Sequence, residues 1–185
     1  MSVMSATEHI RSWVQEIIVK HAICPFAKRE VERNTIRYQE CDAESAADIL
    51  EQLVLECMVL DRHPETETTI IILTKGFADF HQYLQLVETA EDLIVEYDYE
   101  GIYQIASFHP DYCFAGEPAD DPANFTNRAP YPLLHILREG SVEKALQHYQ
   151  EPESIPERNI EFARSKGNDF WLAALAQLKS SHDTK

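Results

Sequence analysis

The stretch Thr68–Thr74 restricts the possible folds of this chain more than any other segment. Within it the four aliphatic residues Ile70–Leu73 follow one another without a polar break. This density of β-branched residues is typical of a strand whose two faces are both buried. A strand of that kind needs a layer of structure on each side, so the sequence predicts a layered α/β protein.

Helical and strand patterns alternate around this segment. Strand patterns occupy Thr35–Cys41 and Ile102–Phe108. Between them, Asp42 is expected to cap a helix with an apolar stripe from Leu50 to Cys57, and Asp79 to cap a second, longer helix. Connections of this length favour parallel strands with right-handed crossovers. We therefore expect an α/β fold with a small, mainly parallel sheet of three to four strands covered by helices, in a single domain over residues 1–185.

The two ends of the chain carry helical patterns. Ser5 and Glu8 have the spacing of a capping box before a helix that ends near His21. Pro25 suits the first position of a short helix that follows. The C-terminal tail is predicted to be helical, with a second capping box beginning at Ser154 and a break at Gly167.

Residues 109–132 form a predicted loop that holds five of the nine prolines of the chain. A long, stiffened loop in a compact domain is commonly a functional one. The next residues, 133–139, have a pattern compatible with a strand or a helix, and we favour the strand.

The charge of the chain is strongly acidic and unevenly distributed. The formal net charge is −16, from 32 acidic and 16 basic residues. This balance disfavours binding to nucleic acid or to an anionic membrane. Glu40–Glu67, with nine acids and one base, and Asp79–Glu100, with seven acids and no base, together supply −15. Against them, Lys20–Arg37 holds five bases and two acids, net +3, and this basic island contains Cys24.

The cysteines and the N-terminus point to the cytoplasm. Cys24, Cys41, Cys57 and Cys113 are widely spaced and form no Cys-x-x-Cys pair, so a disulfide framework is not expected. Met1–Val14 lacks the apolar core of a secretory signal. We expect a cytoplasmic protein.

A candidate site follows from the expected sheet. Carboxyl ends of parallel strands share one edge, where ligands bind, and these ends fall near Cys41, Lys75 and His109. Cys24 precedes a short helix expected to point to the same edge, and Arg29 of that helix is a candidate to hold an anionic ligand. Cys24 is thus a candidate thiolate nucleophile, with His109 as its base and Asp111 beside it. The alternative is that Cys24 is a small buried apolar residue.

Further candidate ligand contacts come from the long loop and the segment after it. Asn127, Arg128 and Tyr131 combine an amide, a guanidinium and a ring on a backbone stiffened by prolines, a set that suits capture of a carboxylate or phosphate. Equally, Arg128 could pair with an aspartate of the loop and hold the loop down. His135 and Arg138 are weaker candidates, because they share a face only if their segment is helical.

A metal site has weaker support. His109, Asp111 and Cys113 alternate and would lie on one side of an extended segment, but no fourth ligand is evident and Pro110 is expected to turn the chain. We assign no metal ligand, and the cofactor, if there is one, is unknown.

Several strings resemble a family of bacterial proteins catalogued as a domain of unknown function. They are Cys24-Pro25-Phe26-Ala27, Ser107-Phe108-His109-Pro110-Asp111-Tyr112, Phe114-Ala115-Gly116, Asn127-Arg128-Ala129-Pro130-Tyr131-Pro132, Leu134-His135-Ile136-Leu137-Arg138-Glu139 and Ile155-Pro156-Glu157-Arg158-Asn159. The resemblance covers residues 8–172 and implies a single-domain cytoplasmic bacterial protein, but no activity. In that family the position of Cys113 is usually Gln, which counts against Cys113 as a required metal ligand.

Three functions remain open from the sequence. The favoured one is binding of a small anionic ligand at a rim formed by Cys24, His109 and Arg128, with thiol or acid–base chemistry. The alternative is a non-catalytic module that binds a protein partner through its acidic helices. A metal-dependent hydrolase comes third.

Overall fold

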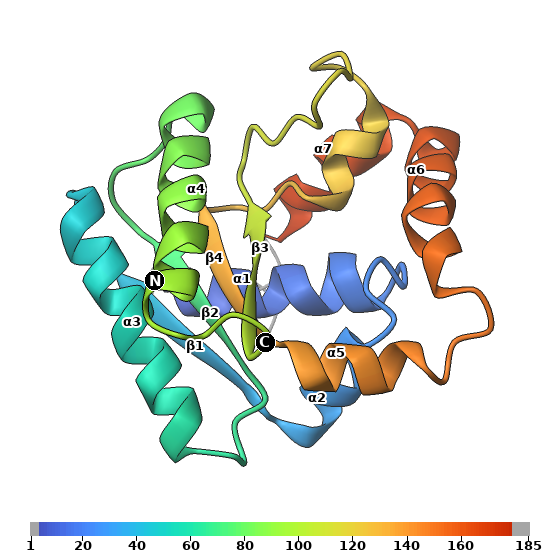
Figure 1. The fold of residues 1–185 in the computed structure, drawn as a ribbon. Coiled ribbons are helices and arrows are strands. Elements are labelled where there is room, and N and C mark those ends of the chain that lie inside the picture. Colours follow the sequence, from blue (N-terminus) through green and yellow to red (C-terminus); the bar gives the residue numbers. More distant parts are fainter. Residues whose placement is uncertain (1–3, 179–185) are drawn as a thin grey trace.

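The structure is a computed structural model that describes residues 4–178. At its centre lies strand β2 (Thr68–Leu73), in which every residue is buried. Strand β1 (Ile36–Cys41) pairs with β2 in parallel. On the other side β4 (Leu133–Arg138) pairs with β2 antiparallel, and β3 (Tyr103–Phe108) pairs antiparallel with β4. The sheet is therefore open and has the order β1-β2-β4-β3 (Figure 1).

The expectation of a mainly parallel sheet is wrong, because the sheet is mixed. Strands β1, β2 and β3 do run in the same direction, as expected, but β4 lies between β2 and β3 in the opposite direction. The pairing of Phe108 with Leu133 gives the reason. The loop at 109–132 leaves and re-enters the sheet at the same edge without a crossover helix, so β4 must run antiparallel. The predicted strand at 133–139 is confirmed.

Helices α3 (Ala46–Arg62) and α4 (Phe80–Glu96) cover one face of the sheet. Alternate residues of the central strands point to them, because side chains of a strand alternate between its faces. This core contains Ile49, Leu53, Cys57 and Leu60 of α3, Tyr83, Leu86 and Ala90 of α4, and Ile71, Leu73, Leu134 and Ile136 of the sheet.

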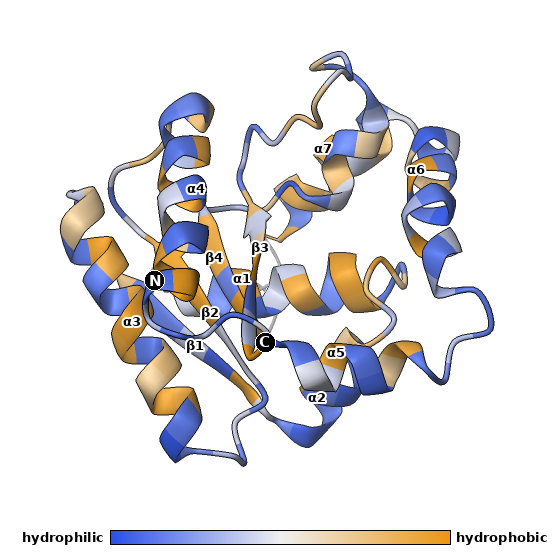
Figure 2. Ribbon diagram, viewed as in Figure 1, coloured by the Kyte–Doolittle hydropathy of each residue, from blue (hydrophilic) through white to orange (hydrophobic). Residues whose placement is uncertain are grey.

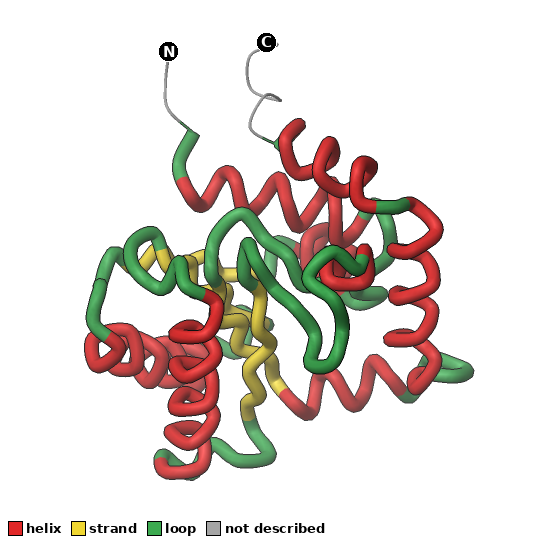
Figure 3. Tube along the Cα trace, turned by 90° about the horizontal axis from the view of Figure 1, so that it is seen from above, coloured by secondary structure: helices red, strands yellow, loops and turns green. Residues whose placement is uncertain are grey.

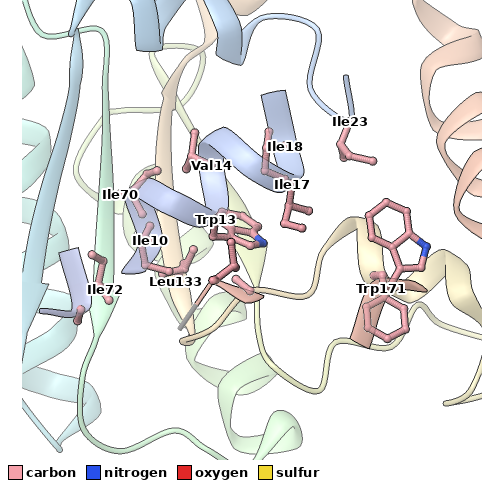
Figure 4. Packing of buried hydrophobic residues seen from close by; sticks show 14 of the residues in the cluster. Ile10, Trp13, Val14, Ile17, Ile18, Ile23, Ile70, Ile72, Leu133 and Trp171 are labelled. Atoms are coloured by element: carbon pink, nitrogen blue, oxygen red, sulfur yellow. The ribbon is translucent and has the colours of Figure 1, made fainter. Parts of the chain in front are cut away.

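The opposite face is covered by helix α1 (Ala6–Trp13), which continues as a π-helical turn, η1 (Val14–Val19), and by the C-terminal helices α6 (Ile155–Lys166) and α7 (Asn168–Gln177). Figure 4 shows this second core. Its labelled members are Ile10, Trp13, Val14, Ile17, Ile18, Ile23, Ile70, Ile72, Leu133 and Trp171.

Shorter elements complete the chain. Helix α2 (Ala27–Arg33) precedes β1, and helix α5 (Glu139–Leu146) follows β4 directly. The long loop includes the 3-10 turn η2 (Pro122–Thr126), which contacts α6 and α7. Figure 3 shows this irregular segment between the sheet and the C-terminal helices. A further 3-10 turn, η3 (Pro152–Ser154), leads into α6.

Two predicted helix starts and one predicted helix end are confirmed. Ser5 accepts a hydrogen bond from the backbone N–H of Glu8, and Glu8 bonds back to the N–H of Ser5. Asp79 accepts from a backbone N–H in the first turn of α4. Gly167 separates α6 from α7 at a φ of +79°, a conformation that glycine adopts without strain.

Three other predicted helix starts are corrected. The cap of α3 is Ser45, not Asp42, because a strand-to-helix connection needs several residues to place the helix on the face of the sheet. Ser154 forms no capping box, since its backbone is helical rather than extended and its hydroxyl donates to a preceding carbonyl. Pro25 does not begin α2, which starts at Ala27.

Candidate functional site

The carboxyl ends of β1, β2 and β3 lie at the same end of the sheet, as expected. Tyr83 of α4 holds two strands together there: its hydroxyl donates to the carbonyl of Leu133 and accepts from the backbone N–H of Phe108, 2.9 Å away. The tyrosine thus joins the end of β3 to the start of β4. Burial raises the pKa of the Tyr83 hydroxyl, which keeps it a neutral donor.

His109 is fully buried at this edge, and both of its ring nitrogens bond to backbone. Nδ1 accepts from the N–H of Asp111 at 3.0 Å, so Nε2 carries the proton and donates to the carbonyl of Phe77 at 2.9 Å. The ring packs against Tyr83, with centroids 4.9 Å apart. These contacts join the start of the long loop to the β2–α4 connection. The carboxylate of Asp111 is on an exposed residue.

Arg128 connects distant parts of the long loop by hydrogen bonds to two of its backbone carbonyls. Its Nε donates to the carbonyl of Tyr112 at 3.0 Å and its Nη2 to the carbonyl of Ala119 at 2.8 Å. The guanidinium lies 4.7 Å above the ring of Phe125, and burial lowers the pKa of Arg128. The alternative of a loop clamp fits these contacts, although Arg128 bonds to carbonyls rather than to an aspartate.

The neighbours of Arg128 in sequence have similar contacts. Asn127 donates from Nδ2 to the carbonyl of Ser107 at 3.0 Å, which ties the end of the loop to β3. The ring of Tyr131 packs on the α1 side, 5.8 Å edge-on from His9. Both side chains therefore help to seat the loop on the sheet.

The residues that precede Cys24 contact α6, whereas His109 contacts the β2–α4 connection. The carbonyls that precede it in sequence, those of Ala22 and Ile23, accept hydrogen bonds from Arg158 and Asn159 of α6, each 2.7 Å long. Burial raises the pKa of the Cys24 thiol, although the N–H groups at the start of α2 oppose this effect. A raised pKa disfavours the thiolate form at neutral pH, so it gives no support to the predicted nucleophile.

The basic island is largely neutralised by neighbouring acids. Arg37 forms a hydrogen-bonded ion pair of 2.7 Å with Glu56, a buried residue of α3, which raises the pKa of Arg37. Lys20 pairs with Glu16 at 3.0 Å. The side chain of Arg29 is 70% exposed and lies 3.7 Å from Glu30, so it points into solvent.

His135 and Arg138 lie on opposite faces of β4, because they are an odd number of residues apart. Nε2 of His135 bonds to the hydroxyl of Thr68 at 2.7 Å, and burial lowers the pKa of His135 to about 4. Arg138 donates from Nη2 to the carbonyls of Leu60 at 2.7 Å and Thr66 at 2.9 Å. It therefore binds the C-terminal end of α3.

Residues 4–178 contain no set of metal ligands, because no three His, Cys, Asp or Glu side chains among them are grouped so that they could hold an ion. His109 has both nitrogens engaged. The thiol of Cys113 donates to the carbonyl of Glu117 at 3.3 Å.

The predicted anion-binding rim therefore stays a prediction. The described contacts connect the residues just before Cys24 to α6, His109 to the β2–α4 connection and Arg128 to its own loop, and none of them joins two of these three side chains.

Two hollows that the sequence analysis did not identify lie elsewhere. The larger, of about 450 Å³, is the α3–α4 groove, lined by Ala47, Leu50, Glu51, Val54, Leu55, Met58, Leu93 and Tyr97. The smaller, of about 120 Å³, lies between α1, α2 and β1 and includes Arg11 and Tyr38. The sequence did contain a signal for the groove. The apolar residues of α3 cover more of the helix circumference than one core-facing stripe requires, and Leu55 and Met58 are the apolar residues outside that stripe.

Fold and contacts together define a three-layer α/β protein with a mixed four-stranded sheet, whose long loop is held in place by buried polar side chains. The sequence profile of the family described as "Protein of unknown function (DUF1415)" matches residues 5–173, and the chain belongs to this family. Comparison with curated proteins and with solved structures finds no significant match. Within residues 4–178, no helix has both the length and the apolar character that crossing a membrane requires.

Proposed function

We propose that this protein is a protein-interaction module whose α3–α4 groove binds the apolar face of a basic amphipathic helix. The observation that carries the proposal is an exposed apolar groove within the most acidic part of the chain. Binding of this kind, in which a helix lies in a groove, depends on a few apolar anchors spaced along one helical face.

Apolar side chains line the α3–α4 groove and face solvent. The exposed fractions are 48% for Leu55, 39% for Met58 and 49% for Tyr97. Single exposed apolar residues are ordinary on protein surfaces, but several of them around one hollow indicate an interaction site. In Figure 2 hydrophobic segments recur along α3 between hydrophilic ones. Met58 adds a flexible side chain that adapts to the shape of a partner.

The negative charge around the groove favours a partner that carries positive charge. Glu51 lines the groove itself, and the two segments that contain α3 and α4 carry −15 of the net charge of −16. The last turn of α4 contains Glu96 and no basic residue. A partner with Lys or Arg beside its apolar face is attracted to this surface.

A second copy of the chain fits the groove poorly. A twofold interface would place the same acidic surface on both sides, and like charges that face each other oppose association. The charge therefore favours a basic partner of different sequence.

Titration of a fluorescent Leu/Lys amphipathic helical peptide with the full chain tests the proposal. We expect saturable binding that weakens as salt rises, because part of the affinity is electrostatic. Leu55→Asp is expected to weaken binding by about tenfold or more, the loss of a central anchor. Leu84→Asp is the matched control: Leu84 is 40% exposed on α4, does not line the groove, and receives the same new charge.

The outcomes separate the proposal from its alternatives. Equal binding by wild type and Leu55→Asp, or equal losses in Leu55→Asp and Leu84→Asp, would show that the groove is not the site. Equal affinity for a Leu/Glu peptide would refute the basic character of the partner. Dimerisation of the free chain that Leu55→Asp abolishes would favour a second copy as the occupant.

A further inference from the structure

The smaller hollow combines the exposed Arg11 side chain with a lining that is part polar and part apolar. It has a volume of about 120 Å³ and lies where η1, α2 and the start of β1 meet. Val31 and Ile36 supply apolar lining. An apolar protein cavity of roughly 150 Å³ holds a benzene molecule, so this one has room for a ligand of about six non-hydrogen atoms.

Arg11 supplies the positive charge at this cavity. Its guanidinium lies 4.2 Å from the centre of the Tyr38 ring. Among residues 4–178 no carboxylate forms an ion pair with it, although the chain has twice as many acidic as basic residues. Stacking on a ring holds the plane of a guanidinium and leaves its N–H edge available for the two oxygens of a carboxylate.

The helix beside the cavity has an irregular geometry. The N–H of Lys20 bonds to the carbonyl of Gln15 at 3.1 Å, the wider spacing of a π-helical turn. Such turns are rare and are frequently found at functional sites. Gln15 belongs to this turn and lines the cavity, one helical turn after Arg11, so its amide adds a hydrogen-bonding group on the same side.

Glu30 limits what else the ligand can carry. This residue also lines the cavity, and its carboxylate accepts from the hydroxyl of Thr35. A second negative group on the ligand would approach Glu30 and be repelled. Because Glu30 repels any carboxylate in the hollow, a single one must lie on the Arg11 side, and a second one has no positive side chain to offset the repulsion.

We propose that the Arg11 cavity binds a small aliphatic monocarboxylate, with the carboxylate on Arg11 and the hydrocarbon chain on Val31 and Ile36. This inference is independent of the α3–α4 groove, which lies on the other face of the sheet.

Titration of the full, ¹⁵N-labelled chain with butyrate tests it by nuclear magnetic resonance. We expect saturable shifts of backbone amides around Arg11, Gln15 and Ile36. Arg11→Gln should weaken the affinity by up to about fivefold, since a charge pair on an exposed arginine is lost. Arg33→Gln is the matched control: it removes the same charge from an exposed residue of α2 that does not line the cavity, and should change the affinity less than about twofold.

Two further ligands test the chemistry. Butylamine, with the same chain and the opposite charge, should not bind, and succinate should bind more weakly than butyrate because of Glu30. Equal affinities of wild type and Arg11→Gln, or equal losses in Arg11→Gln and Arg33→Gln, would overturn the proposal. Succinate binding as tight as that of butyrate would mean that negative charge alone is recognised, which would overturn it as well.

Discussion

At the scale of single residues, several side chains of types that are common in active sites form hydrogen bonds to backbone groups in this protein. His109 and Arg128 bond to carbonyls and N–H groups of an irregular segment. Such a segment lacks the regular partners that a helix or sheet provides, and buried main-chain groups without partners are costly. Polar side chains in the loop at 109–132 supply those partners.

His135 makes a pH-dependent contribution to stability. Its pKa in the folded protein is about 4, below the 6.5 of an unperturbed histidine. As the pH falls from 6.5 towards 4, the unfolded chain binds the proton first, so stability present above pH 6.5 is lost in this window. We expect a loss of about 3 kcal/mol from this residue by pH 4.

Urea denaturation of wild type and His135→Gln between pH 7 and pH 4 measures this contribution, because Gln keeps a donor towards Thr68 but does not titrate. The free energy of unfolding of wild type, relative to that of His135→Gln, should fall by about 3 kcal/mol between pH 7 and pH 4. Parallel pH profiles would show that the ring is already protonated, or solvated, in the folded state.

At the scale of elements, Arg138 connects β4 to the end of α3. Its guanidinium bonds to the carbonyls of Leu60 and Thr66 and lies 5.8 Å from the centre of the Tyr103 ring. The last carbonyls of a helix lack partners within the helix, and a cation there also interacts favourably with the helix dipole. Asp61 accepts from the hydroxyl of Tyr103 at 2.7 Å and completes the junction.

Arg138→Gln is expected to lower the free energy of unfolding by about 2 kcal/mol, because several charge-assisted hydrogen bonds are lost. Urea denaturation measures the effect, and hydrogen exchange should show faster opening of the last turn of α3. Arg62→Gln, in the same last turn but exposed, is the control and should change stability by less than about 0.5 kcal/mol. An Arg138→Gln protein as stable as the control would mean that the helix end is held by other contacts.

At the scale of the whole molecule, two acidic helices lie on one face of the sheet and most of the basic residues lie elsewhere. The self-repulsion of a net charge of −16 destabilises the folded state, and salt screens it. The same field is what would attract a basic partner to the α3–α4 groove.

We expect the melting temperature to rise by a few degrees between about 10 mM and 500 mM NaCl, where the Debye length falls from roughly 30 Å to a few Å. Replacing exposed acids of α3 and α4 (Asp48, Glu51, Glu91 and Asp92) by their amides should reduce this dependence. A melting temperature that is independent of salt, or unaltered in its dependence by the amides, would mean that the charges are already neutralised by local pairs.

The sequence by itself determined the strands and their shared edge. The apolar run at Thr68–Leu73 identified the central strand, and alternation of strands with amphipathic helices placed the ends of β1, β2 and β3 together. These features are local or depend on connection length, so pattern and propensity are sufficient to predict them. The candidate residues were found by type, but type does not reveal whether His109 faces a ligand or the carbonyl of Phe77.

Only the tertiary structure decided the direction of β4, the partners of the loop and the faces left exposed. The antiparallel insertion of β4 depends on where the loop at 109–132 returns, a long-range property that no local pattern encodes. Whether Leu55 and Met58 are buried or exposed depends on how far α4 extends beside α3. Arg11 becomes a candidate ligand-binding group only because α1, α2 and β1 meet around it. Burial and pairing are set by neighbours distant in sequence, and in this protein those neighbours give His109 and Arg128 main-chain partners that their residue types did not reveal.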